Sequence, residues 1–300
     1  MKPIRFKKTS SNMLIIVIIL AWLNSCSILN ITPSKKIHKI SFENIDNKED
    51  CDFIFSDTTN NEYLKKFRNE YKINELTREV KTDLEKIFIV LNWTNSRWEH
   101  SGSNTPKKSD AFTILEEAKQ GNSFRCVEYG IVAATALNSI GISARTLGLK
   151  TKDVEKTRHG AGHVVTEAYL NNLEKWIFID GQMNLIPFLD DKPLNAVEFQ
   201  KAIFNNKEKI QLRSINKIAD KNDSESYIKW VGRYLYFFSA RFDNRENYET
   251  NKIKCKDKSS LMLVPIGAKN PQVFQKKHAM DYLIYTNSYT YFYKEPKFRQ

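Results

Sequence analysis

Three residues in the middle of the chain have the types and spacing needed for nucleophilic catalysis. Cys126 follows a Gly-Asn-Ser break and stands where a helical pattern begins. The unpaired N–H groups and the dipole of a helix N-terminus stabilise a thiolate there. His163 and Asp180 lie in two strand-like segments further along the chain. Because an imidazole can take the thiol proton and a carboxylate can orient the imidazole, these residues indicate a Cys–His–Asp catalytic unit.

The segments around His163 and Asp180 predict how the two residues meet. Asn171 and Asn172 predict the turn of a hairpin between these segments, because Asn tolerates the positive φ of a tight turn. In that register His163 lies directly opposite Asp180 on one face of the sheet. The register predicts two further pairs on that face: Val165 with Phe178, and Glu167 with Trp176.

A second histidine, His159, is the alternative candidate for the base. It lies in a loop rich in Lys, Arg and Gly and has no partner in the predicted register, so His163 is the favoured base. Acyl transfer also needs hydrogen-bond donors for the developing oxyanion, and the backbone N–H of Cys126 is one candidate.

The elements that must position these residues follow from the hydrophobic pattern. A helical pattern covers residues 63–98, a short helix is predicted at 110–119 with Asp110 as its N-cap, and a third at 126–140 ends at Gly141. Strand-like segments follow at 143–149, 163–170 and 176–180. Helices followed by adjacent strands predict an α+β fold with an antiparallel sheet. Beyond residue 190 the sequence predicts a helix at 196–210 and aromatic-rich strand-like segments at 227–242, 260–266 and 279–293, the first of which could instead be helical.

Taken in order, these segments resemble the transglutaminase-like superfamily, papain-like cysteine enzymes with a Cys–His–Asp triad in this chain order. The likeness covers roughly residues 84–187. Its specific points are the small-residue helix opened by Cys126, the G-I-S-A-R run at 141–145, the Gly-His pair that starts a strand holding Glu167, and the W-I-F-I-D run at 176–180. The resemblance implies a papain/transglutaminase-like core in which Cys126, His163 and Asp180 are the catalytic residues.

The resemblance also implies a second oxyanion donor from a side chain upstream of the cysteine. Trp93 and Gln120 are the two candidates. Arg145 is expected to pair with an acidic side chain as part of the scaffold. Val127 and Val164 stand where many family members have aromatic residues, which leaves the substrate specificity open.

The first 26 residues resemble the export signal of a bacterial lipoprotein. Basic residues precede an apolar run at 13–23, which is too short to span a bilayer, and L-N-S-C follows at 23–26. In that family the leader is cut before the cysteine, which is then acylated. We therefore expect a signal peptide at 1–25, lipidation at Cys26, and a lipid-anchored protein in the cell envelope.

Acylation of Cys26 leaves three of the four cysteines in an oxidising compartment. Cys51 and Cys255 could pair or could remain thiols, and the sequence leaves both possibilities open. An odd cysteine such as Cys126 is then a candidate free, reactive thiol.

The composition and charge of the chain argue for some classes of function and against others. The 300 residues are 41% hydrophobic and 12% aromatic, enough for a sizeable core. The net charge of +12 suits an anionic partner, but export and the lack of a compact basic motif argue against nucleic acid. No run has calcium-loop or zinc-site spacing, so neither a metal nor another cofactor is expected.

The predicted organisation is a tether and N-terminal segment at 26–60, a catalytic domain at 61–190, and an extension of unknown role at 191–300. The predicted function is hydrolysis or transfer of an amide or peptide acyl group through a cysteine thioester, with a peptide or protein substrate in the cell envelope. The alternatives are a catalytically silent lipoprotein that uses the fold for binding or scaffolding, and a binder of anionic polymers.

Overall fold

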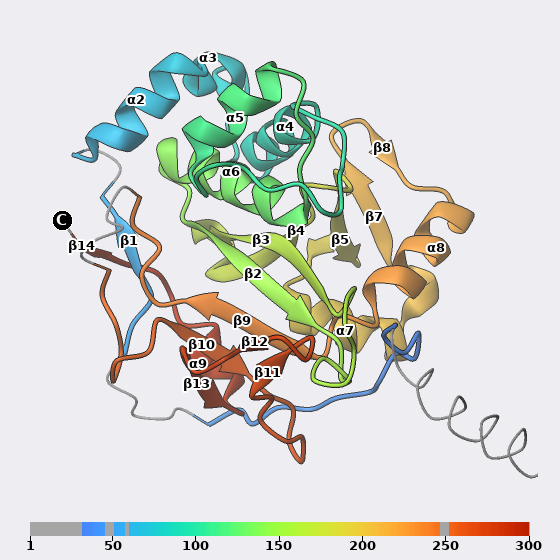
Figure 1. Ribbon diagram of the computed structural model, residues 1–300. Helices are drawn as coiled ribbons and strands as arrows, with labels where there is room; N and C mark the ends of the chain where they lie inside the picture. Colours follow the sequence, from blue (N-terminus) through green and yellow to red (C-terminus); the bar gives the residue numbers. More distant parts are fainter. Residues whose placement is uncertain (1–31, 46–50, 58–59, 247–251, 300) are drawn as a thin grey trace, which may run out of the picture.

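The computed structural model describes residues 32–299 except 46–50, 58–59 and 247–251. The predicted leader and Cys26 therefore lie outside the described residues. The fold is α+β, as predicted: a six-stranded sheet lies between a group of N-terminal helices and a second layer built mainly from C-terminal elements (Figure 1). Within the described ranges, no helix combines the length and the apolar character needed to cross a membrane.

The N-terminal helices are shorter than the continuous pattern at 63–98 predicts. Lys72 adopts a left-handed conformation (φ 53°) and interrupts the helix, and Thr82 forms a capping box with Glu85 that starts a new one. Asp110 is the N-cap of the next helix, as predicted, and its Oδ1 accepts the N–H of Thr113 at 3.0 Å. The helices are α2 (Glu62–Glu70), α3 (Ile73–Thr77), α4 (Asp83–Asn95) and α5 (Ala111–Lys119).

Helix α6 (Cys126–Ser139) lies across β2 and β3 of the sheet (Figure 1). Its alanines and glycine permit this close packing, and Ala133 and Ala136 are buried. Gly141 follows the helix with φ 86°, the left-handed conformation expected after a helix C-terminus. The predicted helix at 126–140 is therefore confirmed.

The central sheet has the strand order β13-β10-β9-β2-β3-β4. Its neighbours are antiparallel except β10 and β13, which are parallel, so the predicted antiparallel sheet is mixed at one edge. Three of its strands come after residue 190, so the predicted boundary at 190 does not separate two sheets. The strands are β2 (Ala144–Lys150), β3 (Gly162–Leu170), β4 (Lys175–Ile179), β9 (Phe237–Arg241), β10 (Ser260–Leu263) and β13 (Leu283–Thr286).

The hairpin between β3 and β4 has a register two residues away from the predicted one. Thr166 pairs with Ile179, so the prediction that His163 lies directly opposite Asp180 was wrong, as were the two further pairs. The turn is longer than expected because a 3-10 turn at Asn171–Leu173 is followed by Glu174 in the left-handed conformation (φ 50°). A shift of two residues leaves every side chain on its original face. His163 and Asp180 therefore still point to the same side of the sheet.

The extension supplies both helices and small sheets. The ambiguous segment at 227–242 contains the end of α8 followed, after a turn, by β9. The helices of the extension are α7 (Ala196–Asn205), α8 (Lys221–Val231) and α9 (Tyr289–Phe292). The smaller strands are β5 (Ile186–Leu189), β6 (Lys192–Pro193), β7 (Gln211–Ser214), β8 (Lys217–Ile218), β11 (Val273–Phe274) and β12 (His278–Ala279).

A strand from the N-terminal part of the chain pairs with the last described strand. Strand β1 (Ile54–Ser56) pairs in parallel with β14 (Lys297–Arg299), and Cys51 forms a disulfide with Cys255 across 204 residues of sequence. Of the two possibilities left open by the sequence, the structure has the disulfide.

Candidate active site

Cys126 is the first residue of α6, where unpaired backbone N–H groups and the helix dipole favour a negative charge. It is partly exposed and is the one free cysteine among the described residues. The start of the helix is held by Glu128, a fully buried carboxylate that accepts the backbone N–H of Arg125 at 3.1 Å and forms an ion pair with its guanidinium at 2.6 Å. These contacts fix the backbone at the residue before Cys126.

His163 and Asp180 form a buried pair. Nε2 of His163 lies 2.9 Å from Oδ2 of Asp180, and the two residues are 3% and 0% exposed. Oδ1 of Asp180 accepts the backbone N–H of Met183 at 3.1 Å, so both carboxylate oxygens are engaged. Because Nε2 faces the carboxylate, Nδ1 is the nitrogen left for the thiol.

Two opposing effects act on the pKa of His163. Burial of the ring lowers the pKa, because the charged form loses its water. The charge and hydrogen bond of Asp180, and a hydrogen bond and charge from Cys126, raise it and prevail, bringing the pKa to about 10. The influence of Cys126 on this pKa indicates that its side chain lies close to the ring. The three predicted residues are thus together in space, with the imidazole favoured in its protonated form at neutral pH.

Two glycines let the helix approach the other two residues. A Cβ at Gly130, one turn after Cys126, would lie 3.1 Å from Cγ1 of Val164, the residue after His163. A Cβ at Gly181 would lie 3.3 Å from Cβ of Tyr129. These distances are tighter than ordinary packing, so α6 seats closely against β3 and the loop after Asp180 because both positions lack a side chain.

The extension completes the site with residues that the sequence did not single out. The hydroxyl of Tyr227 on α8 donates to Oδ2 of Asp180 at 2.8 Å. The rings of Trp230 and Tyr234 lie 4.8 and 5.9 Å from the imidazole of His163. These aromatic residues fall in the segment at 227–242, whose pattern was ambiguous between helix and strand. The only signal in the sequence was its aromatic richness.

The structure does not bring the two predicted oxyanion side chains to the thiol. The indole of Trp93 packs against Phe67 and Tyr71 of the N-terminal helices, with their ring centroids 6.4 and 6.0 Å away. Gln120 is exposed and donates to Glu116 at 3.3 Å. Both side chains are used by the packing and surface of α2–α5, which the spacing in sequence could not reveal.

A different tryptophan, Trp98, has an indole N–H available near the start of α6. Its ring lies 4.5 Å from Tyr129 and 5.8 Å from Phe124, on either side of Cys126 in the sequence. Its indole N–H is buried and has no hydrogen-bond partner among the described residues. Buried donors without a partner are uncommon in folded proteins. Trp98 is therefore a donor close to the start of α6 that is left for another acceptor.

The other histidines play different parts. His159, the alternative base, is exposed in its loop and makes no hydrogen bond or ion pair with any described residue. His100 is exposed, and its pKa is lowered by burial of part of the ring and by the positive charge of His163, against the opposing charge of Asp180. Its electrostatic coupling places His100 near the His163–Asp180 pair.

Arg145 has the scaffold role expected of it. Its guanidinium is fully buried, forms an ion pair with Glu167 at 2.8 Å and stacks over Trp176 at 4.3 Å. Across the described part of the chain, no group of three or more His, Cys, Asp or Glu side chains is placed to hold a metal ion.

Comparison with known proteins finds a family match over the part of the chain that holds these residues. Residues 71–181 match the model of the transglutaminase-like superfamily, and this range contains Cys126, His163 and Asp180. Among curated proteins none matches the chain.

Several solved structures are similar to parts of the chain. A candidate cysteine protease from Cytophaga hutchinsonii is 16% identical with a TM-score of 0.32, over 41% of this chain and 39% of that one. LapG of Legionella pneumophila is 15% identical with a TM-score of 0.30, over 58% and 95%. Red sea bream transglutaminase is 12% identical with a TM-score of 0.30, over 61% and 44%. The first of these is thus matched over well under half of its own length. Residues 71–181 of this chain are a transglutaminase-like superfamily domain.

Proposed function

We propose that this chain is a cysteine enzyme that cleaves or transfers an amide-linked acyl group. The observation that carries the proposal is the buried His163–Asp180 pair, 2.9 Å apart, beside a free thiol at a helix N-terminus that raises the pKa of His163. A carboxylate that holds an imidazole beside a thiol is the arrangement that nucleophilic acyl transfer requires.

In the proposed first step the sulfur of Cys126, whose proton is held by His163, attacks the carbonyl carbon of an amide. A C–S bond forms, and the carbonyl π electrons move onto the oxygen. When the tetrahedral species collapses, the C–N bond breaks and His163 gives its proton to the leaving nitrogen. The products are a thioester on Cys126 and a free amine.

The second step decides between hydrolysis and transfer. Water attacks the thioester while His163 takes its proton, the C–S bond breaks, and a carboxylic acid leaves as the thiol is restored. An amine in place of water gives a new amide. Asp180 holds the imidazole in one orientation through both steps and stabilises its charged form. We favour hydrolysis, because no apparatus for a second, amine substrate is evident from the sequence.

We assign the oxyanion donors to the backbone N–H of Cys126 and the indole N–H of Trp98. The first belongs to the first turn of α6, and the second is buried and without a partner among the described residues. A preorganised donor of this kind costs no rearrangement when the negative charge develops.

We propose a peptide or protein of the cell envelope as the substrate, and lipid attachment at Cys26 as the means by which the enzyme is held at the membrane. Both rest on the leader and the L-N-S-C run at 23–26. A metabolic label of fatty acid that is lost in Cys26→Ala would support the anchor.

The enzyme proposal is tested by labelling the whole protein with an amide-mimicking electrophile, a peptidyl vinyl sulfone, and mapping the modified residue by mass spectrometry. We expect modification at Cys126, none in Cys126→Ala, and a rate at least a hundredfold lower in His163→Ala. Labelling unchanged by Cys126→Ala would refute the proposal. Labelling of Cys126 no faster than that of a free cysteine would favour the silent scaffold instead.

A further inference from the structure

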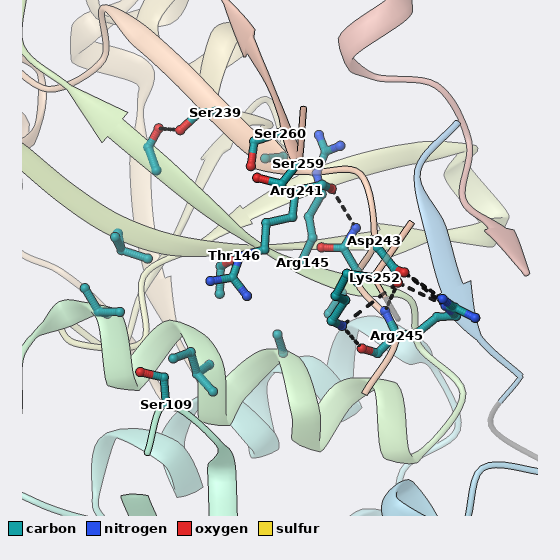
Figure 2. Close-up of a pocket in the computed structure, with 18 of the residues that line it drawn as sticks. Ser109, Arg145, Thr146, Ser239, Arg241, Asp243, Arg245, Lys252, Ser259 and Ser260 are labelled. Carbon is teal, nitrogen blue, oxygen red and sulfur yellow. Dashed lines mark hydrogen bonds and ion pairs between the residues drawn. The ribbon is translucent and has the colours of Figure 1, made fainter. Parts of the chain in front are cut away.

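A cavity of about 450 Å³ lies beside the nucleophile helix, between α6 and the face of strands β2 and β9 (Figure 2). Helix α6 covers β2 and β3 but leaves part of this face of the sheet open. The cavity is lined by charged and hydroxyl side chains as well as by apolar residues of α6.

Lys150 is an unusual feature of this cavity. The residue is 7% exposed, and its ammonium donates to Oγ of Ser239 at 2.7 Å. It forms no ion pair with any carboxylate in the described ranges. Buried ammonium groups in proteins are normally paired, because the loss of water is costly for a charge. Burial lowers the pKa of Lys150 to about 8, so the group is still largely charged at neutral pH.

A glycine makes room for this ammonium against the sheet. Gly148 pairs with Ser239 across β2 and β9. A Cβ at position 148 would lie 2.7 Å from Oγ of Ser239 and 3.2 Å from Nζ of Lys150. The ammonium therefore bends back over Gly148, and together with the hydroxyl of Ser239 it takes the room that a side chain at 148 would need. We call the part of the cavity lined by Gly148, Lys150 and Ser239 the cradle.

Arg241 brings a second positive charge to the same cavity. It lies two residues beyond Ser239 on β9, on the same face, and its side chain extends into the space between the sheet and α6 beside Thr146 (Figure 2). It has no ion pair among the described residues. Two carboxylates also line the cavity: Glu246 accepts the hydroxyl of Thr135 at 3.0 Å and feels the charge of Arg241, and Asp243 forms an ion pair with Arg245 at 2.8 Å. Lys150 and Arg241 thus line the same cavity, and neither forms an ion pair with a described residue.

The cradle is connected to the candidate active site. Gly148 pairs on its other side with Val164, the residue after His163. Val164 and Val127, the residue after Cys126, line the same cavity. The cavity therefore extends to the sequence neighbours of Cys126 and His163.

We propose that Lys150, Ser239 and Arg241 bind a carboxylate of the substrate, so that the enzyme selects peptides with an acidic side chain close to the scissile amide. A carboxylate fits because it accepts from an ammonium, a hydroxyl and a guanidinium at once, and charge-assisted hydrogen bonds are the strong ones. Its identity as the substrate's carboxylate rests on the proposed function, but the binding of a carboxylate does not.

The test measures binding without turnover. Fluorescein-labelled tetraglutamate and tetraglutamine are titrated with the full-length Cys126→Ser protein and followed by fluorescence anisotropy. We expect tetraglutamate to bind at least tenfold more tightly than tetraglutamine. Arg241→Gln and Lys150→Met should each weaken tetraglutamate binding at least tenfold, and Lys201→Gln, which removes the same charge from the exposed face of α7, should change it less than twofold.

Arg241 is exposed, so Arg241→Gln keeps the test decisive even if Lys150→Met fails to fold. Equal affinity for the two peptides, or tetraglutamate affinity unaffected by Arg241→Gln and by folded Lys150→Met, would overturn the proposal. Because the nucleophile is absent, this result is independent of the vinyl sulfone experiment. If the Cys126→Ser protein binds tetraglutamate as expected but the parent protein is not labelled by the vinyl sulfone, the enzyme proposal is refuted and the carboxylate site stands.

Discussion

The hydroxyl of Tyr227 lies 2.8 Å from Oδ2 of Asp180, the same oxygen that faces Nε2 of His163 at 2.9 Å. Tyr227 belongs to α8, outside the range of the family match at 71–181. Burial and the Asp180 carboxylate raise the pKa of Tyr227 well above its usual value, so the phenol stays neutral and remains a donor. The extension therefore helps to orient the carboxylate that orients the histidine.

Tyr227→Phe should slow acylation of Cys126 by roughly tenfold, or about 1.4 kcal/mol, since Asp180 loses one of its donors. The reaction with p-nitrophenyl acetate, followed across pH, measures this. Tyr293→Phe is the matched control, because its hydroxyl donates to another buried carboxylate, Glu167, at 3.0 Å. Both variants should lose about 1–2 kcal/mol of unfolding free energy. Equal acylation rates in the two variants would assign Tyr227 a purely structural role.

Trp98→Phe should slow acylation by p-nitrophenyl acetate about a hundredfold, because the reaction passes through an oxyanion that loses a donor. Alkylation of Cys126 by iodoacetamide forms no oxyanion and should change less than twofold. Trp93→Phe, which alters an indole in the packing of the N-terminal helices, is the control and should affect neither reaction. A parallel fall in both reactions of Trp98→Phe would contradict the assignment.

The raised pKa of His163 makes stability depend on pH in a defined direction. Its folded value is about 10 and its unfolded value about 6.5, so its contribution is complete below pH 6.5 and is lost as the pH rises towards 10. The difference in unfolding free energy between the parent protein and His163→Gln should therefore shrink by at least about 1.4 kcal/mol between pH 6 and pH 10. Urea denaturation of both proteins at the two pH values measures it, and a constant or growing difference would refute the pairing.

Gly130→Val should push α6 away from β3, because a Cβ there already lies 3.1 Å from Val164. We expect a loss of about 1–3 kcal/mol of unfolding free energy and slower vinyl sulfone labelling of Cys126. Gly102→Val is the control, since no atom lies within 4 Å of a Cβ at that position. If Gly130→Val labelled at the parent rate, close approach of the helix would not be what brings the thiol to His163.

Joint replacement of Cys51 and Cys255 by serine should lower the unfolding free energy by up to about 5 kcal/mol, because the disulfide closes a loop of 204 residues. Differential scanning calorimetry with and without a reducing agent measures the change. The reducing agent should have no further effect on the double variant. An identical melting temperature for the parent under both conditions would show that the disulfide does not contribute.

The local parts of the site could be predicted because they depend on neighbours in the sequence. The helix start at Cys126, the cap at Asp110 and the stop at Gly141 each follow from a few adjacent residues. The register of His163 and Asp180 could not, because the extra turn residues at Asn171–Leu173 and Glu174 carry no clear length signal. The register differs from the predicted one by an even number of residues, two. An even shift keeps the side chains of His163 and Asp180 on the same face of the sheet.

The remaining parts depend on contacts between distant segments. Whether Trp93 or Trp98 has a free indole N–H depends on the packing of Tyr129 and Phe67, which periodicity does not reveal. The contact of Tyr227 with Asp180 joins residues 47 positions apart through a helix whose pattern was ambiguous. Such contacts are visible only once the sheet has brought the extension beside the candidate catalytic residues.

The continuity of the sheet has a consequence for how this protein can be divided or recombined. Strand β2 is flanked by β3 from the family-matched range and by β9 from the extension. A recombination event that transplanted only residues 71–181 into another protein would carry Cys126, His163 and Asp180 with it. It would also leave the edge of β2 open to intermolecular pairing, and Asp180 without Tyr227. The range matched by the family model is thus smaller than the structural unit that holds the sheet and the Asp180–Tyr227 contact together.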